Sequence, residues 1–197
     1  MLKTRRLREQ FNIAWLGILV VVPCLILVLL AGCGPGEQPL EEVEMTLSVS
    51  GSAFQEGGKI PAKYTCEGQD ISPALTWDEL PAGTRSFALI MDDPDAPIGI
   101  FTHWVLFNLP ADACELPEAV PAQAQLPDGS LQGKNDFGKT GYGGPCPPSG
   151  RPHRYQFTLY ALDQALDLKA GASKKQLLDA MPGHVLAQGI LTGTYQR

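Results

Sequence analysis

The hydrophobic positions of this chain fall into short runs separated by turn residues. Continuous apolar runs occupy 87–91 and 104–107, and runs of this length are typical of buried strands. Between 155 and 161 the apolar residues alternate with other residues, which indicates a strand with one buried face. Weaker strand patterns lie at 46–50, 63–66, 75–77 and 190–195. The pattern therefore predicts seven or eight strands.

One helix is predicted near the C-terminus. Ser173 and Gln176 have the spacing of a capping box, apolar residues follow as far as Met181, and Pro182-Gly183 ends the pattern. Residues 110–150 are rich in Pro, Gly, Asp and Ala, and an irregular stretch of this length is usually functional or disordered. We predict a mainly β fold, a two-sheet sandwich with Greek-key connections and one or two short helices.

The first 32 residues have the pattern of a secretory signal. A basic head precedes an apolar stretch from 13 to 30, and the segment closes with Leu30-Ala31-Gly32-Cys33. These four residues resemble the lipobox of bacterial lipoproteins, in which the cysteine is lipidated by acyl chains such as palmitate. An uncleaved membrane anchor is the alternative. In both cases we expect a protein of the cell envelope, held at a membrane and facing away from the cytoplasm.

Charge and composition divide the remaining chain. Residues 33–45 lack an apolar period and are predicted to be a flexible linker, which leaves a domain at 46–197. The first 32 residues contain four basic residues and one acidic residue and so carry a net charge of +3. Since the whole chain carries −6, residues 33–197 carry −9. A domain this acidic is a poor partner for nucleic acid.

Three cysteines lie in the predicted domain, Cys66, Cys114 and Cys146. A disulfide is permitted outside the cytoplasm. Cys66 and Cys146 each lie in a loop rich in Gly or Pro, which favours that pair, and three free thiols are the alternative. The cysteines and histidines do not have the spacing of a zinc site, so we predict neither a metal nor a cofactor.

The most unusual loop connects the two apolar runs. It contains Asp93-Pro94-Asp95-Ala96-Pro97, and His103 directly precedes the run that follows. Binding groups concentrate on loops that rigid strands hold in place. A solvated acidic turn is the alternative. Because the chain must reverse here, the Ala96-Pro97 bond is a candidate cis peptide.

A second segment contains Gly143-Gly144-Pro145 and, further on, His153-Arg154-Tyr155. Together the two segments resemble the signature segments of the phosphatidylethanolamine-binding protein family, also called Raf kinase inhibitor-like proteins. Residues 66–73, with Trp77, resemble the bacterial branch of that family. The resemblance extends over residues 46–195.

The resemblance implies a two-sheet β fold with a small anion pocket at one end. The pocket accepts phosphate-like groups, including phospholipid heads. In this sequence the residues that match its lining are Asp93, Asp95, His103, Gly143, Gly144, Pro145, His153 and Tyr155. Eukaryotic members add a C-terminal helix beside the pocket, whereas this sequence ends at Arg197, which predicts a more open site.

Each type of group has an expected role. The histidines donate hydrogen bonds to the ligand, and the backbone N–H groups of Gly143 and Gly144 complete an anion nest. Asp93 and Asp95 orient the rings or accept from a ligand ammonium. Arg151 and Arg154 are expected to be solvated charges. The alternative is that both histidines are satisfied core groups that tie loops together.

Three functions remain open from the sequence. The first is a non-enzymatic binding or regulatory module for a phosphorylated or zwitterionic small molecule or headgroup. The second is a protein inhibitor of a kinase or protease. The third is a hydrolase or metalloenzyme, although Ser72 and Ser149 lack the GxSxG context of a nucleophile.

The signal segment yields the first testable prediction. Cys33→Ser should abolish metabolic labelling of the protein with radioactive palmitate, because the acylated thiol is lost. Cys24→Ser is the matched control, since Cys24 lies within the predicted signal, and it should keep the label. Undiminished labelling of the Cys33→Ser protein would contradict the lipobox interpretation.

Overall fold

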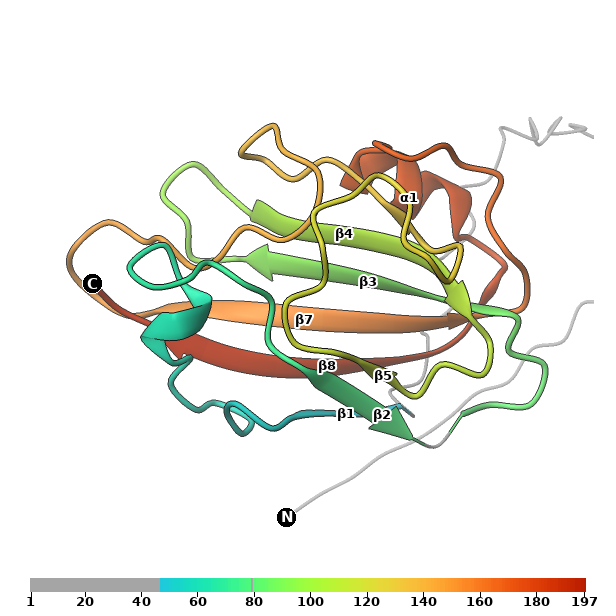
Figure 1. Cartoon of the computed structure of the whole chain (residues 1–197), viewed down its shortest axis with the longest axis horizontal. Coiled ribbons are helices and arrows are strands. Elements are labelled where there is room, and N and C mark those ends of the chain that lie inside the picture. The colour runs from blue at the N-terminus through green and yellow to red at the C-terminus, as the bar shows by residue number, and fades with distance from the viewer. Residues whose placement is uncertain (1–46, 79) are drawn as a thin grey trace, which may run out of the picture. The chain divides into compact units, whose positions relative to one another are not determined.

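The computed structural model of the chain describes residues 47–78 and 80–197, and these form a mainly β structure (Figure 1). The predicted signal segment 1–32 and linker 33–45 lie outside the described residues. Two helical segments are present in the described part, η1 (Ala62–Tyr64) and α1 (Lys174–Ala180). The strands are β1 (Ser48–Gly51), β2 (Leu75–Asp78), β3 (Ser86–Asp93), β4 (Phe101–Pro110), β5 (Glu115–Leu116), β6 (Leu131–Gln132), β7 (His153–Leu162) and β8 (Val185–Tyr195).

The strands form two antiparallel sheets, which confirms the predicted fold class. The smaller sheet has the order β1-β2-β5, and the larger has the order β6-β4-β3-β7-β8. The chain leaves the larger sheet after β4, contributes β5 to the smaller one, and returns through β6 and β7. This path places β3 at the centre of the larger sheet, between β4 and β7.

Two hydrophobic cores cover the two faces of the larger sheet. The first lies between the sheets and takes Phe87, Leu89 and Met91 from β3. The second takes the intervening Ala88 and Ile90 and packs beneath α1. Successive side chains of a strand point to opposite faces, so every residue of β3 from Phe87 to Met91 faces one core or the other and is apolar. This double burial explains why its sequence is a continuous run rather than an alternating one.

Strand β4 has the same double burial, but its register with β3 is interrupted twice. Met91 lies opposite Trp104, and Asp92 lies opposite Thr102, so His103 has no partner residue on β3. Asn108 is passed over in the same way near the other end of the strand. Such bulges redirect side chains and are frequent beside functional sites.

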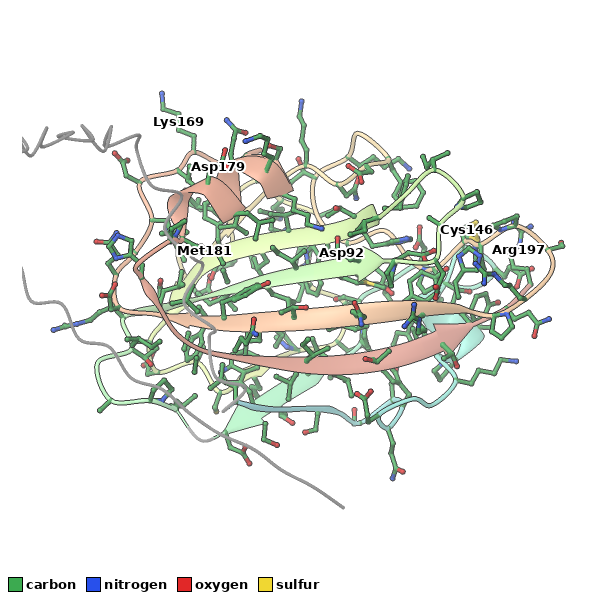
Figure 2. The ribbon with its side chains drawn as sticks, turned by 180° about the vertical axis from the view of Figure 1, so that it is seen from behind. Asp92, Cys146, Lys169, Asp179, Met181 and Arg197 are labelled. Carbon is green, nitrogen blue, oxygen red and sulfur yellow. A yellow bond between two sulfur atoms is a disulfide. The ribbon has the colours of Figure 1, made fainter. Side chains whose placement is uncertain are left out.

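The Asn108 bulge joins β4 to the second core. Asn108 has a φ of 57°, and its side-chain amide exchanges two hydrogen bonds with the backbone of Leu166, at 2.8 and 2.9 Å. Leu166 belongs to the core beneath α1. Figure 2 shows Met181 beside α1, and Cys146 with Arg197 at the other end of the domain.

The predicted capping box is present at the start of α1. The Ser173 hydroxyl accepts from the Gln176 backbone N–H, and the Gln176 side chain accepts from the Ser173 N–H at 2.9 Å. Leu177 is the fully buried residue of the helix. No helix in residues 47–78 or 80–197 is long and apolar enough to cross a membrane.

Three local predictions were wrong. Residues 62–64 form a 3-10 turn instead of a strand, and the last strand begins at Val185 rather than at 190. The described residues contain no cis peptide bond, so Ala96-Pro97 is trans. The loop reverses by other means: Gly99 adopts a φ of 101° and donates its N–H to the Ala96 carbonyl at 3.1 Å.

A disulfide joins Cys66 to Cys146, 80 residues apart in the sequence, as expected for that pair, and Cys114 is a free, exposed thiol. We expect the double variant Cys66→Ser/Cys146→Ser to lose about 2–4 kcal/mol of unfolding free energy, because the unfolded chain regains the freedom of a long loop. Denaturant titration measures this. Cys114→Ser is the control, and an equally small change in both proteins would contradict the prediction.

Candidate functional site

A polar cluster closes one end of the core between the sheets. The β3 row that faces this core, Phe87, Leu89 and Met91, continues to Asp93. On the neighbouring β7 the corresponding row contains Tyr155 and begins at His153. Asp93 and His153 are each only 3% exposed. Strand alternation thus carries these side chains to the end of the core.

Asp93 holds His153 in place. Nδ1 of His153 lies 2.8 Å from Oδ2 of Asp93, and Oδ1 of Asp93 accepts the Asp95 backbone N–H at 2.8 Å. A carboxylate partner places the ring proton on Nδ1. Nε2 of His153 is therefore the ring nitrogen available to a ligand.

His103 is the bulge residue of β4 that has no partner residue on β3. Its Nδ1 donates to the Gly143 carbonyl at 2.7 Å, and Gly143 N–H donates to the His103 carbonyl at 3.0 Å. The rings of Phe101, Phe137 and Tyr155 meet the imidazole edge-on, with centroids 5.2–5.3 Å away. This burial lowers the pKa of His103, although the Gly143 carbonyl and the charge of Asp93 oppose the shift.

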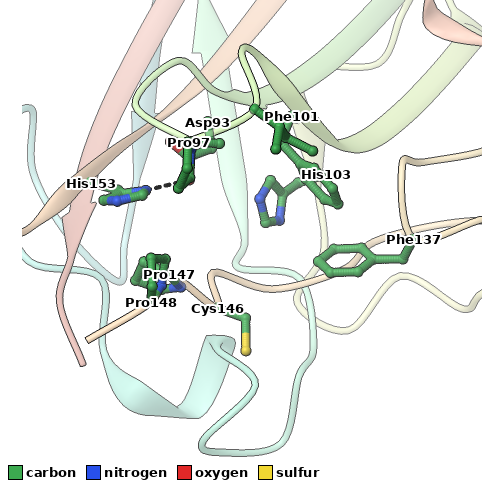
Figure 3. Close-up of a pocket in the computed structure, with 11 residues that line it drawn as sticks. Asp93, Pro97, Phe101, His103, Phe137, Cys146, Pro147, Pro148 and His153 are labelled. Atoms are coloured by element: carbon green, nitrogen blue, oxygen red, sulfur yellow. Dashed lines mark hydrogen bonds and ion pairs between the residues drawn. The ribbon is translucent and has the colours of Figure 1, made fainter. Parts of the chain in front are cut away.

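Asp93, His103 and His153 face a pocket of about 240 Å³ (Figure 3). The remaining lining residues come from the 96–101 loop, the turn at 137 and the 146–148 segment. They are Ala96, Pro97, Ile98, Phe101, Phe137, Cys146, Pro147 and Pro148. The pocket thus combines two imidazoles and one carboxylate with an otherwise apolar wall.

The 143–146 segment lies at one side of the site and is held by residues that do not line the pocket. Gly144 N–H donates to Oδ1 of Asp70 at 2.6 Å, and the Pro145 carbonyl accepts from Cys66 N–H at 3.2 Å. A Cβ on Gly144 would lie 2.4 Å from the Tyr64 carbonyl oxygen, so only glycine permits this approach. The disulfide adds a covalent link at the next position.

The expected anion nest at Gly143 and Gly144 is absent from this arrangement. Both N–H groups donate to the protein, to the His103 carbonyl and to Asp70. Gly143, Gly144 and Pro145 support the pocket from behind, and the residues after them line it. The nest does not form because β4 takes the Gly143 N–H and the Asp70 carboxylate takes the Gly144 N–H.

Asp95 also differs from its expected role. Its two oxygens accept from Nε and Nη2 of Arg154 at 2.8 Å each, and Oδ2 also accepts from the Arg154 backbone N–H. The guanidinium lowers the pKa of Asp95 well below its usual range. Asp95 does not line the pocket. Arg154, expected to be a solvated charge, is exposed, and it is also the partner that holds the loop to β7.

Tyr155 lies behind the pocket. It is fully buried, and its ring packs edge-on against His103. Burial and the nearby charge of Asp93 raise the pKa of its hydroxyl well above the usual range. Tyr155 therefore supports the His103 ring as a neutral phenol.

Sequence reasoning missed most of the apolar wall. Phe137 carries the clearest signal, an aromatic residue in the polar turn 135–138 that is 43% exposed. Ser72 and Ser149 do not line the pocket, and the Ser72 hydroxyl accepts from Val120 N–H. Within the described ranges, no group of three or more His, Cys, Asp or Glu residues could hold a metal ion.

Comparisons with known proteins show which family and which fold the chain resembles. A model of the phosphatidylethanolamine-binding protein family matches residues 50–196. A UPF0098 protein of Methanothermobacter thermautotrophicus is 58% identical over 145 residues, 74% of this chain and 95% of the relative. One of Pyrococcus horikoshii is 47% identical over 184 residues, 91% of this chain and 89% of the relative.

Two solved structures have the same fold. A phosphatidylethanolamine-binding protein homologue from Chlamydia trachomatis is 38% identical with a TM-score of 0.71, over 78% of this chain and 99% of that one. E. coli YbcL is 34% identical with a TM-score of 0.72, over 77% and 99%.

The enclosure of His103 leads to a prediction about its titration. NMR should show a pKa for His103 below the usual value of about 6.5, because the surrounding rings exclude water from the charged form. Phe137→Ala should raise this pKa by opening one side of the enclosure. Leu178→Ala, an exposed change on α1, is the control. An unchanged His103 pKa in the Phe137→Ala protein would contradict this account.

Proposed function

Because this chain belongs to the phosphatidylethanolamine-binding protein family, we propose that it is a non-enzymatic binding module whose pocket takes a phosphoryl-type anion on His103 and His153. The observation that carries the proposal is the pair of buried imidazoles, each with Nδ1 bonded to the protein and Nε2 left for a ligand. Two such nitrogens in one small pocket suit the several acceptor oxygens of a phosphoryl group.

The carboxylate in the pocket is compatible with an anion. Both oxygens of Asp93 already accept hydrogen bonds, from His153 and from Asp95 N–H. Its negative charge favours the protonated form of His103 and so helps to provide the positive charge that an anion needs. Asp93 therefore acts on the ligand through the histidines.

Binding should be accompanied by proton uptake. His103 uses Nδ1–H for the Gly143 carbonyl, so a neutral ring presents Nε2 only as an acceptor. An anion that accepts from Nε2 needs the protonated ring and raises the pKa of His103 from its lowered value. Affinity is then greatest below the pKa of the free protein and declines as the pH rises through the pKa of the complex.

The second part of the proposal concerns location. Lipidation at Cys33 would hold the pocket near a membrane outside the cytoplasm, so that the ligand is met there, either as a small molecule or as a headgroup. The Cys66–Cys146 disulfide supports an oxidising compartment. A protein target is a further candidate partner.

Loss of one imidazole tests the site. His153→Ala should weaken phosphate binding by about 1.5–3 kcal/mol, the scale of one charge-assisted hydrogen bond, in calorimetric titration of the full-length protein. His184→Ala is the matched control. His184 lies just before β8, pairs with Asp163 and is far from the pocket. Equal phosphate affinity in the His153→Ala and wild-type proteins would refute the proposed site.

The pH dependence is a separate prediction. Sulfate affinity should fall between pH 5 and pH 8, because sulfate stays a dianion over this range while the His103 imidazole loses its charge. Calorimetry in two buffers of different ionisation enthalpy should reveal protons taken up on binding. Sulfate affinity that is independent of pH would show that the ligand does not bind protonated histidines.

A further inference from the structure

The polar and apolar groups of the pocket are separated. Asp93, His103 and His153 are buried, whereas the apolar residues of the mouth, as we call it, are exposed or, for Phe101, partly exposed: Pro97, Ile98, Phe101, Phe137 and Pro148. Figure 3 shows the labelled lining residues around the two imidazoles. An anion held by the imidazoles therefore directs its substituent past an apolar wall. The chemistry of this wall determines which substituent fits.

The mouth is apolar and unusually exposed. Ile98 is 84% exposed and Phe137 is 43% exposed, among the most exposed large apolar residues in the described part of the chain. The Phe137 ring is held against Phe101 with centroids 4.7 Å apart. A rigid ring pair beside a free isoleucine is a surface that gains free energy when an apolar group covers it.

The one carboxylate among the described residues that lines the pocket, Asp93, is already engaged, and the neighbouring carboxylates do not line it. Asp93 accepts from His153 and from Asp95 N–H, and Asp95 is held by the bidentate contact with Arg154. Asp70 and Asp136 accept from the backbone N–H groups of Gly144 and Thr102, and neither lines the pocket. A primary ammonium entering the mouth would lose water without gaining a carboxylate, and an uncompensated charge of this kind is costly.

We propose that the ligand is a phosphate monoester with an apolar substituent, which packs against Ile98, Phe101 and Phe137 while the phosphoryl group binds His103 and His153. This inference rests on the proposed anion site. It assigns selectivity to the mouth: an alkyl or aryl group is favoured, and an ammonium two carbons from the phosphate is disfavoured.

A pair of esters with the same shape tests the proposal. n-Propyl phosphate and phosphoethanolamine differ only in a terminal methyl in place of an ammonium. In calorimetric titration of the full-length protein, n-propyl phosphate should bind at least tenfold more tightly. Lengthening the chain to butyl and pentyl should improve affinity by up to about fourfold per methylene, the usual gain for a buried CH₂.

A second pair addresses the aromatic rings. Phosphocholine and 3,3-dimethylbutyl phosphate have the same shape, but only phosphocholine carries a cation that a ring face can attract. The neutral ester should bind more tightly. Tighter binding of phosphocholine would assign the mouth to a quaternary ammonium and overturn the proposal.

Variants at the mouth locate the selectivity. Ile98→Ser, at a highly exposed loop position, should reduce the ratio of n-propyl phosphate affinity to inorganic phosphate affinity. Leu178→Ser, which changes an exposed leucine on α1, should leave that ratio unchanged. An unchanged ratio in Ile98→Ser would contradict the assignment of the substituent to the mouth.

The outcomes separate this inference from the anion site itself. If inorganic phosphate binds through His153 but phosphoethanolamine equals or exceeds n-propyl phosphate, the inference is wrong and the anion site remains. If neither inorganic phosphate nor any ester binds, both are wrong. Co-sedimentation with phosphatidylcholine vesicles containing phosphatidic acid, compared with vesicles lacking it, shows whether the apolar monoester is a lipid or a soluble ester.

Discussion

Strand β3 is buried on both faces, and the positions of both cores and of the pocket depend on this. Because its side chains alternate, one row fills the space between the sheets and the other fills the space beneath α1. The first row ends at Asp93, where the smaller sheet no longer covers it. A carboxylate at that position must be paired, and His153 on the neighbouring strand pairs with it. The site is therefore an end of the core in which hydrogen bonds replace apolar packing.

The electrostatics of this end differ from those of a preformed positive cavity. The aromatic rings around His103 favour the uncharged imidazole, and Asp93 favours the charged one. In the proposed complex the anion would supply the remaining stabilisation of the charged form, so the positive charge would be largely created on binding. Two of the three rings around His103, those of Phe101 and Phe137, also belong to the apolar mouth, and the proposals therefore assign proton coupling and substituent selectivity to the same two side chains.

The long strands β3, β4 and β7, the capped helix and the family were predictable because each has a local pattern: apolar runs, the Ser173–Gln176 spacing, and histidines in two signature segments. Contacts that depend on register were not. The Asp95–Arg154 pair joins residues 59 apart, and the use of Gly144 N–H by Asp70 joins residues 74 apart. The bulge at His103 could not be predicted from the sequence, because one unpaired residue redirects the side chains of the strand without altering the local pattern of residue types. Phe137 lies in a long irregular stretch without periodicity.

The two bulges of β4 also determine which kinds of sequence change the strand can accept. His103 and Asn108 enclose four residues, Trp104 to Phe107, that stay in register with β3 and supply both cores alternately. Inserting or deleting one residue between the bulges would move the residues on one side of the change to the opposite face of the sheet, and so from one core to the other. The segment should therefore tolerate substitutions of similar volume better than changes in length.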